Sequence, residues 1–225
     1  MNSVVIVAGG SGTRMGSLTA KQYLKIGDMP ILMHTMAAFF NFDVSIDIVL
    51  VLPSGDRDFW QTLCNDYGFK VPHRTTVGGS SRFLSVKNGL AACDPASKLV
   101  AIHDAVRPFV AESVIRQGFE VAAQHGSAIP VVPLKDSLRR VEADGRSTFQ
   151  DRQAFRLVQT PQIFQKPRIL QAFRVEDNPA FTDDATVYEH QGWEVTLYPG
   201  NPENIKITSP EDMAYAEFLL NGLST

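Results

Sequence analysis

The first part of the chain alternates short, continuous apolar runs with segments of helical period. The apolar runs cover residues 4–7, 46–52, 98–103 and 127–133. Runs of this kind, rich in valine and isoleucine, predict strands that are buried on both faces of a sheet. Strands that alternate with helices at this spacing predict an α/β fold. We therefore expect a Rossmann-like, doubly wound and mostly parallel sheet.

Further elements are predicted from apolar spacing and from helix start signals. Thr182-Asp183-Asp184 resembles a helix N-cap followed by acidic residues, and Ser209-Pro210 places proline at the first position of a last helix. Short strands are expected near 74–77 and, of an antiparallel type, at 193–200. Helices are expected from residue 31, over 54–67, from about 81 to 93, over roughly 112–124, from 167, and from 209 to about 220.

Residues 134–156 interrupt this alternation. The segment is polar and rich in arginine, and Asp144-Gly145 in its middle is a typical hairpin turn. An isolated hairpin is only marginally stable in water, so we expect it to pack on another surface, such as a second subunit. The sequence thus predicts a single domain over residues 1–225 with a dimerisation β-arm at about 134–156.

Composition narrows the class of protein. The chain has 225 residues, 44% of them hydrophobic, which is enough for a buried core. Its formal charge of −3 gives no basic field for nucleic acid. Cys64 and Cys93 lack metal or redox spacing and are expected to be buried in helices. We expect no signal peptide, because a strand is predicted to begin by residue 4, and no apolar run in the sequence approaches 18 residues. We therefore expect a cytoplasmic protein without membrane partners.

A glycine-rich loop, AGGSGTRMG at residues 8–16, follows the first strand. Glycines let backbone N–H groups approach a ligand, and a strand that leads into such a loop is typical of phosphate binding. The loop lacks the ending of a Walker A motif. Its glycines also miss the dinucleotide spacing, and no acid follows the second strand to bind a ribose. Hydride transfer is therefore disfavoured. The simpler alternative to phosphate binding is that the loop is a structural turn without a ligand.

Two cations, one within this loop and one shortly after it, favour chemistry at a triphosphate. Arg14 and Lys21 suit a transition state that gathers negative charge on phosphate oxygens. Asp104 follows a buried strand, where a carboxylate needs a counter-charge; Mg²⁺ bridging phosphates would supply one, and an ion pair with Arg107 or a turn cap is the alternative. His103 has no second ligand at metal spacing and is expected to be a core or hydrogen-bonding residue.

The carboxyl ends of parallel strands face the ligand in doubly wound sheets. Loops 8–16, 78–85 and 103–108 should therefore share one cleft. No serine or cysteine nucleophile set is present, which indicates a transfer reaction driven by positioning and charge.

Several motifs, in this order, carry a resemblance to a known family. They are AGGSGTRMG at 8–16, KQYL at 21–24, GG at 78–79 with SV at 85–86, HDAVRP at 103–108, DS at 136–137, DR at 151–152, QTPQIF at 159–164, TDDA at 182–185, and NIKIT at 204–208 before SPED. Together the motifs resemble the 2-C-methyl-D-erythritol 4-phosphate cytidylyltransferases of the non-mevalonate isoprenoid pathway, over nearly the whole chain.

The resemblance implies transfer of the cytidylyl group of CTP to methylerythritol phosphate, with Mg²⁺ as cofactor and release of pyrophosphate. It also implies site residues. Ala8, Gly9, Gly10, Gly79 and Ser85 would hold cytosine and ribose; Arg14 and Lys21 would stabilise the pentacoordinate phosphate; Asp104 would bind Mg²⁺, with Lys206 on the α-phosphate; and Arg107, Ser137, Arg152 and Thr182 would form the sugar-phosphate pocket, Arg152 coming from the partner's arm in a homodimer.

Three of these implied site residues also have a simpler explanation. Lys206 could be a solvated charge at a strand end, Thr182 a helix cap, and Arg152 an ordinary surface arginine. Two positions depart from the family pattern: Ala20 stands where a proline is common, and Ser137 stands where threonine is expected, which keeps the hydroxyl.

Two other functions remain open at this point. The related ribitol-5-phosphate cytidylyltransferases share the glycine loop, KQ and an HD-x-VRP segment, so the nucleotide half does not separate the two acceptors. HDAVRP and the arm favour methylerythritol phosphate. A nucleotide-binding sensor without turnover is the alternative from another class, although binding alone does not require cations aimed at the α-phosphate.

Overall fold

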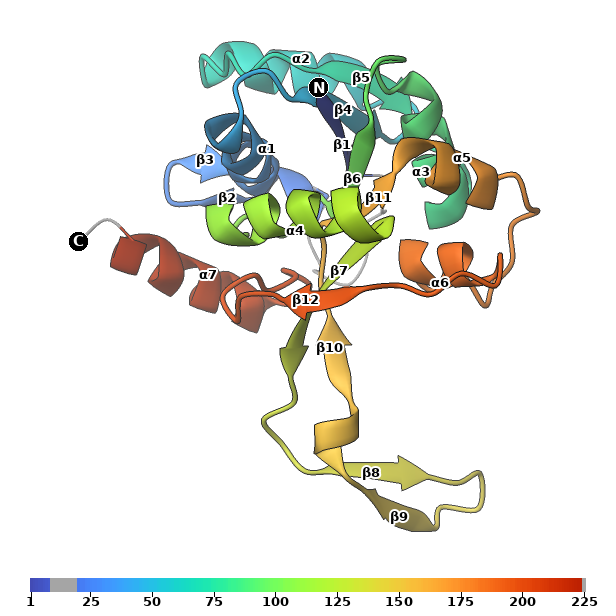
Figure 1. The fold of residues 1–225 in the computed structure, drawn as a ribbon. Coiled ribbons are helices and arrows are strands. Elements are labelled where there is room, and N and C mark those ends of the chain that lie inside the picture. Colours follow the sequence, from blue (N-terminus) through green and yellow to red (C-terminus); the bar gives the residue numbers. More distant parts are fainter. Residues whose placement is uncertain (9–19, 224–225) are drawn as a thin grey trace.

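A twisted central sheet organises the chain (Figure 1). The structure, a computed structural model, describes residues 1–8 and 20–223. The strand order is β10-β7-β11-β6-β1-β4-β5, and β12 pairs with β7 off this path. The strands are β1 (Asn2–Val7), β4 (Asp47–Leu52), β5 (Arg74–Val77), β6 (Leu99–Asp104), β7 (Ser127–Pro133), β10 (Arg156–Val158), β11 (Gln162–Gln165) and β12 (Leu197–Pro199).

The parallel half of the sheet confirms the predicted fold class. Strand β1 lies between β4 and β6 and is parallel to both, and β5 continues the sheet in parallel beside β4. Strands β1, β4 and β6 contain continuous apolar runs, and other elements cover both of their faces. In β4, Ile48 and Leu50 point into one core cluster, whereas Val49 and Val51 point into the other. Such two-sided burial is the reason that the strands read as continuous apolar runs.

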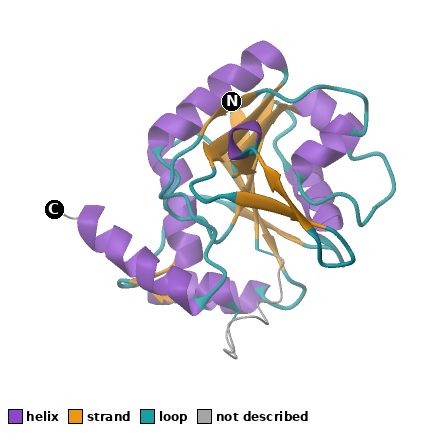
Figure 2. Cartoon of the chain, turned by 90° about the horizontal axis from the view of Figure 1, so that it is seen from below, coloured by secondary structure: helices purple, strands orange, loops and turns teal. Residues whose placement is uncertain are grey.

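Helices cover both faces of the sheet (Figure 2). Helices α1, α2 and α4 pack on one face, and α3, α5 and α6 pack on the other. The α7 helix closes a third, smaller cluster around Ile26 and Ile207. The helices are α1 (Ile31–Phe42), α2 (Arg57–Asp66), α3 (Arg82–Ala92), α4 (Glu112–His125), α5 (Lys166–Ala172), α6 (Asp184–Glu189) and α7 (Pro210–Leu223), with short elements η2 (Lys21–Tyr23), β2 (Lys25–Ile26), β3 (Met29–Pro30) and η3 (Arg152–Ala154).

Two local predictions were wrong. The segment 193–200 was expected to be an antiparallel-type strand, but only β12 within it is paired, and it runs parallel to β7. Alternation of apolar and polar residues shows that a strand is half-buried, here with Tyr198 inside and Leu197 outside, but says nothing of its direction. Cys93 lies just beyond α3 as its C-cap rather than inside the helix; like Cys64 it is buried.

The arm leaves the body as a two-stranded hairpin (Figure 1). Strands β8 (Leu138–Val141) and β9 (Ser147–Gln150) pair in antiparallel fashion, and Gly145 in the turn has φ +84°. Val141 and Phe149 on the hairpin are 68% and 69% exposed. None of the helices that the structure describes is long and apolar enough to cross a membrane.

Candidate active site

A cavity of about 360 Å³ opens at the carboxyl ends of β1, β5 and β6. This is the edge at which the loops after these strands were expected to form one cleft, and the described parts of all three loops line it. The rest of the glycine-rich loop, including Gly9, Gly10 and Arg14, lies outside the described residues. The lining residues are Val7, Ala8, Lys21, Gln22, 79–82, Ser85, 104–106 and Lys206.

A second cavity of about 300 Å³ adjoins the first. The two cavities share three lining residues: Arg82, Asp104 and Lys206. The second is otherwise lined by Arg107, residues 158–160, Gln162, Thr182 and Asp183. The site thus consists of two compartments with a charged wall in common.

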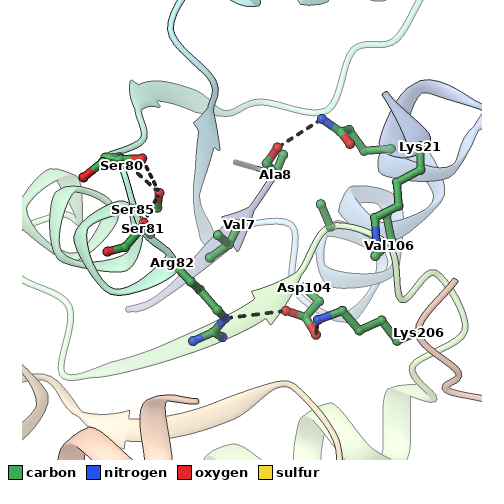
Figure 3. Close-up of a pocket in the computed structure, with 13 residues that line it drawn as sticks. Val7, Ala8, Lys21, Ser80, Ser81, Arg82, Ser85, Asp104, Val106 and Lys206 are labelled. Carbon is green, nitrogen blue, oxygen red and sulfur yellow. Dashed lines mark hydrogen bonds and ion pairs between the residues drawn. The ribbon is translucent and has the colours of Figure 1, made fainter. Parts of the chain in front are cut away.

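Asp104 is the anionic centre of this wall. Its Oδ2 lies 3.1 Å from Nε of Arg107 and 3.2 Å from Nζ of Lys206, and its Oδ1 lies 3.9 Å from Nε of Arg82. Figure 3 shows Arg82 and Lys206 approaching the carboxylate from opposite sides. Burial would raise the pKa of Asp104, but the charges of Lys206, Arg82 and Arg107 lower it well below its ordinary value. The carboxylate is therefore ionised.

These contacts decide two of the alternatives from the sequence. The ion pair between Asp104 and Arg107 exists, so the protein itself supplies counter-charge to this carboxylate. Lys206 is not a merely solvated charge, because it pairs with Asp104 although its side chain is 42% exposed.

His103 is a neutral, structural residue, as predicted. It is fully buried, and burial lowers its pKa to about 4. Because its Nε2 faces the carbonyl of Arg107 at 3.0 Å, that nitrogen donates, and Nδ1 then accepts from the Thr160 hydroxyl at 3.0 Å. Thr160 Oγ1 also accepts from the amide of Asp104. The described residues contain no cluster of three or more potential metal ligands among His, Cys, Asp and Glu.

The loop between β5 and α3 is held by its own serines. Ser81 caps α3 by accepting from the amide of Leu84, and Ser85 Oγ accepts from the amide of Gly79 at 3.1 Å and donates to the carbonyl of Ser81. A Cβ on Gly79 would lie 2.3 Å from Cβ of Leu84. Only glycine therefore fits this turn without a backbone shift.

Sequence reasoning missed Gln22. The residue is 2% exposed, and its side-chain amide donates to the carbonyl of Ala8 at 3.0 Å, which ties η2 to the start of the glycine-rich loop. Of the KQYL motif, the sequence predicts a role for Lys21 alone. Gln22 stands between Lys21 and Tyr23, which gives no local sign of burial, so only the structure shows that this amide is buried and has the partner that it needs.

The start of α6 is built differently from the prediction. Asp183, not Thr182, is the N-cap and forms a capping box with Thr186. Thr182 precedes the helix and lines the second cavity, so its interpretation as a cap is wrong. Gln162 donates to Asp183 Oδ2 and accepts from the amide of Ala185, both at 2.8 Å.

Arg82 is the second residue that sequence reasoning missed. It makes a bidentate ion pair with Asp184, at 2.8 and 2.7 Å. Burial would lower its pKa, but Asp184 and Asp104 raise it above the ordinary value. A signal existed: Arg82 begins α3, where the helix dipole disfavours a cation, and this placement calls for a nearby anion.

The two arm residues of the expected site do not line either cavity in this chain. Ser137 and Arg152 are exposed, and neither belongs to the described lining of the two compartments. Arg152 donates to the backbone carbonyl of Lys135. Of the other predicted residues that the structure describes, six line the first compartment and two more line the second: Ala8, Lys21, Gly79, Ser85, Asp104 and Lys206, then Arg107 and Thr182.

Comparison with known proteins assigns the chain to a family. Residues 2–222 match the family described as IspD, 2-C-methyl-D-erythritol 4-phosphate cytidylyltransferase. Proteins of that name from Bacteroides thetaiotaomicron and Bacteroides fragilis are 49% and 46% identical, each over 97% of this chain and 99% of the relative. The crystal structure of 4-diphosphocytidyl-2C-methyl-D-erythritol synthase from Anaerococcus prevotii has a TM-score of 0.83 at 28% identity, over 98% of both chains. The Thermus thermophilus cytidylyltransferase has a TM-score of 0.79 at 30% identity, over 98% of this chain and 100% of the other. The chain therefore belongs to the 2-C-methyl-D-erythritol 4-phosphate cytidylyltransferase family.

Proposed function

We propose that this protein transfers the cytidylyl group of CTP to 2-C-methyl-D-erythritol 4-phosphate, forming 4-diphosphocytidyl-2-C-methyl-D-erythritol and pyrophosphate in the non-mevalonate route to isoprenoids. The observation that carries the proposal is the charged wall of Asp104, Lys206 and Arg82 between two cavities. A site that joins a nucleotide to a sugar phosphate needs two compartments and a cationic boundary where the phosphates meet. The family assignment favours methylerythritol phosphate over ribitol phosphate as the acceptor.

The first compartment holds CTP. The backbone at Ala8 and Gly79 and the turn fixed by Ser85 contact the cytosine and ribose, together with Gly9 and Gly10. The amides in such a loop suit an uncharged base and sugar because glycine leaves the backbone accessible. The triphosphate then lies toward Lys21, Lys206 and Asp104.

The second compartment holds the acceptor. Arg107 and Thr182 bind the sugar phosphate, whose oxygen attacks the α-phosphorus of CTP. One P–O bond forms, the bond to the β-phosphate oxygen breaks, and pyrophosphate leaves with the bonding electron pair. Lys21, Lys206 and Arg14 stabilise the charge on the pentacoordinate phosphate more than they stabilise the ground state.

Asp104 would hold Mg²⁺ against the triphosphate. Its Oδ2 is engaged by two cations, whereas Oδ1 faces Arg82 at 3.9 Å, beyond hydrogen-bond distance. One carboxylate oxygen is thus open to a cation held mainly by phosphate oxygens, which is the usual arrangement for Mg²⁺ with nucleotides. The ion would neutralise phosphate charge. A site without phosphates would bind Mg²⁺ weakly, because three cations surround this one carboxylate.

The arm joins two copies of the chain in a homodimer. Val141, Phe149 and Phe155 are between 41% and 69% exposed, which is unusual for large apolar side chains grouped on one projection. In the dimer, Arg152 and Ser137 reach the acceptor compartment of the partner subunit, where a forked guanidinium suits a phosphate.

The deciding experiment is an acceptor assay. Purified protein is incubated with CTP, Mg²⁺ and either methylerythritol phosphate or ribitol 5-phosphate, and pyrophosphate release is measured. We expect release with methylerythritol phosphate and loss of it when the metal is chelated. Release with ribitol phosphate alone would contradict the proposed acceptor, and tight CTP binding without release from either would favour a sensor.

A further inference from the structure

We propose that Arg82 is a positioning residue that links the nucleotide compartment to the acceptor compartment. The inference rests on the proposed function and extends it to a residue outside the set of expected ligands. Its guanidinium faces two carboxylates that belong to different parts of the site: Asp184 at the start of α6 and Asp104 at the end of β6. Arg82 lines both cavities.

Asp184 depends on Arg82 for its charge compensation. The Asp184 side chain is 1% exposed, and the Arg82 side chain is 31% exposed. Two N–H groups of the guanidinium meet the two carboxylate oxygens at 2.8 and 2.7 Å. A buried carboxylate without such a partner is strongly unfavourable, so loss of the pair would move the first turn of α6. Thr182, the proposed acceptor ligand, lies two residues before Asp184 and would move with it.

The same side chain also acts on Asp104. Its Nε lies 3.9 Å from Asp104 Oδ1, on the side of the carboxylate opposite Lys206 (Figure 3). A planar guanidinium reaches both carboxylates at once, whereas a lysine ammonium is a point charge that satisfies one of them. Arg82→Lys therefore keeps the charge and removes the link.

Gln162 offers a matched comparison because its side-chain hydrogen bonds go to the start of the same helix rather than to Asp104. It anchors Asp183 and the amide of Ala185. Gln162 lines the same acceptor compartment as Arg82, and Gln162→Met, with a similar side-chain length, removes this anchor while both Arg82 and Asp104 stay in place. A difference in kcat between Arg82→Lys and Gln162→Met therefore reports the effect of the contact between Arg82 and Asp104. Arg116→Lys, at an exposed arginine of α4 paired with Glu112, controls for the exchange of arginine for lysine.

The experiment measures kcat, KM for methylerythritol phosphate, and the Kd of CTP for the full-length protein and these variants. For Arg82→Lys we expect KM for the acceptor to rise about tenfold and kcat to fall about tenfold, with the CTP Kd changed less than threefold. For Gln162→Met we expect the same rise in KM with kcat changed less than threefold. Arg116→Lys is expected to match the unmodified protein.

Hydrogen exchange at the amides of Ala185 and Thr186 gives a readout that does not need turnover. We expect faster exchange in Arg82→Lys than in the unmodified protein. If the unmodified protein releases no pyrophosphate, the proposed function fails, and exchange still decides whether Arg82 holds α6. Three results would each overturn the proposed role of Arg82. The first is an exchange rate in Arg82→Lys equal to that of the unmodified protein, and the second is a kcat and an acceptor KM within twofold of its values. The third is the same pair of kcat and KM values in Arg82→Lys and Gln162→Met.

If Arg82→Lys does not fold, Asp184→Asn replaces it, because an amide keeps the shape and removes the charge pair. We then expect an increase in acceptor KM. An unchanged acceptor KM in a folded Asp184→Asn protein would overturn the proposal.

Discussion

Lys206→Met separates binding of CTP from stabilisation of the transition state. The ammonium lies 3.2 Å from Asp104 Oδ2. Coulomb's law at that distance with an effective dielectric constant of ~20 gives about 5 kcal/mol before solvent screening. The lysine side chain is 42% exposed, and half-exposed pairs retain only about 1 kcal/mol. Asp104 also keeps Arg107 and Arg82. We therefore expect the variant to lose at most about 1 kcal/mol of folding stability.

The loss in catalysis is expected to be larger. Removal of one preorganised charge at the oxygen where charge develops costs ~10²–10³ in kcat, or about 2.7–4 kcal/mol. Steady-state kinetics should show this fall in kcat, while calorimetry should show a CTP Kd weakened less than tenfold. Lys70→Met, at an exposed lysine outside both described cavity linings, is the control. A Kd weakened by the same factor as kcat would refute the reasoning, since Lys206 would then only bind the ground state.

Three further predictions concern other parts of the chain. Gly79→Ala should raise KM for CTP at least tenfold, because a Cβ there would lie 2.3 Å from a neighbouring side chain. Burial lowers the pKa of His73, so the unfolded state binds more protons than the folded state below about pH 6.5. Urea titrations should therefore show the free energy of unfolding falling as the pH drops through that value, and His73→Gln should show a smaller fall. Arg152→Ala should raise KM for the sugar phosphate, and mixing it with Lys21→Ala chains should restore part of the activity.

Each of these has a defined contrary result. Gly222→Ala, where a Cβ meets nothing within 4 Å, controls for the glycine change, and an unaltered CTP KM in Gly79→Ala would show that the turn tolerates a side chain. Equal pH profiles for His73→Gln and the unmodified protein would remove His73 as the cause. Mixed chains that stay inactive would count against an active site shared between subunits.

Long-range contacts account for what sequence reasoning missed at the site. Arg82 and Asp184 are separated by 102 positions, and no local pattern connects them. The partners of Asp104 come from the start of α3, from its own turn and from the loop before α7. The direction of β12 likewise depends on where the chain enters after α6. Only packing decides such pairings, because neither propensity nor periodicity contains the relative placement of distant elements.

The sequence by itself determined the layers and the edge of the sheet that carries the site. Apolar runs such as 4–7 and 46–52 can be stable only between two covering layers. Ala8, Gly79 and Asp104 lie at one edge because the parallel strands β1, β5 and β6 end there. The tertiary structure alone decided how the charges neutralise one another, with Asp104 held by three cations and Arg82 shared between two carboxylates. The physical reason is that a buried charge depends on every group within a few ångströms, whichever part of the chain supplies it.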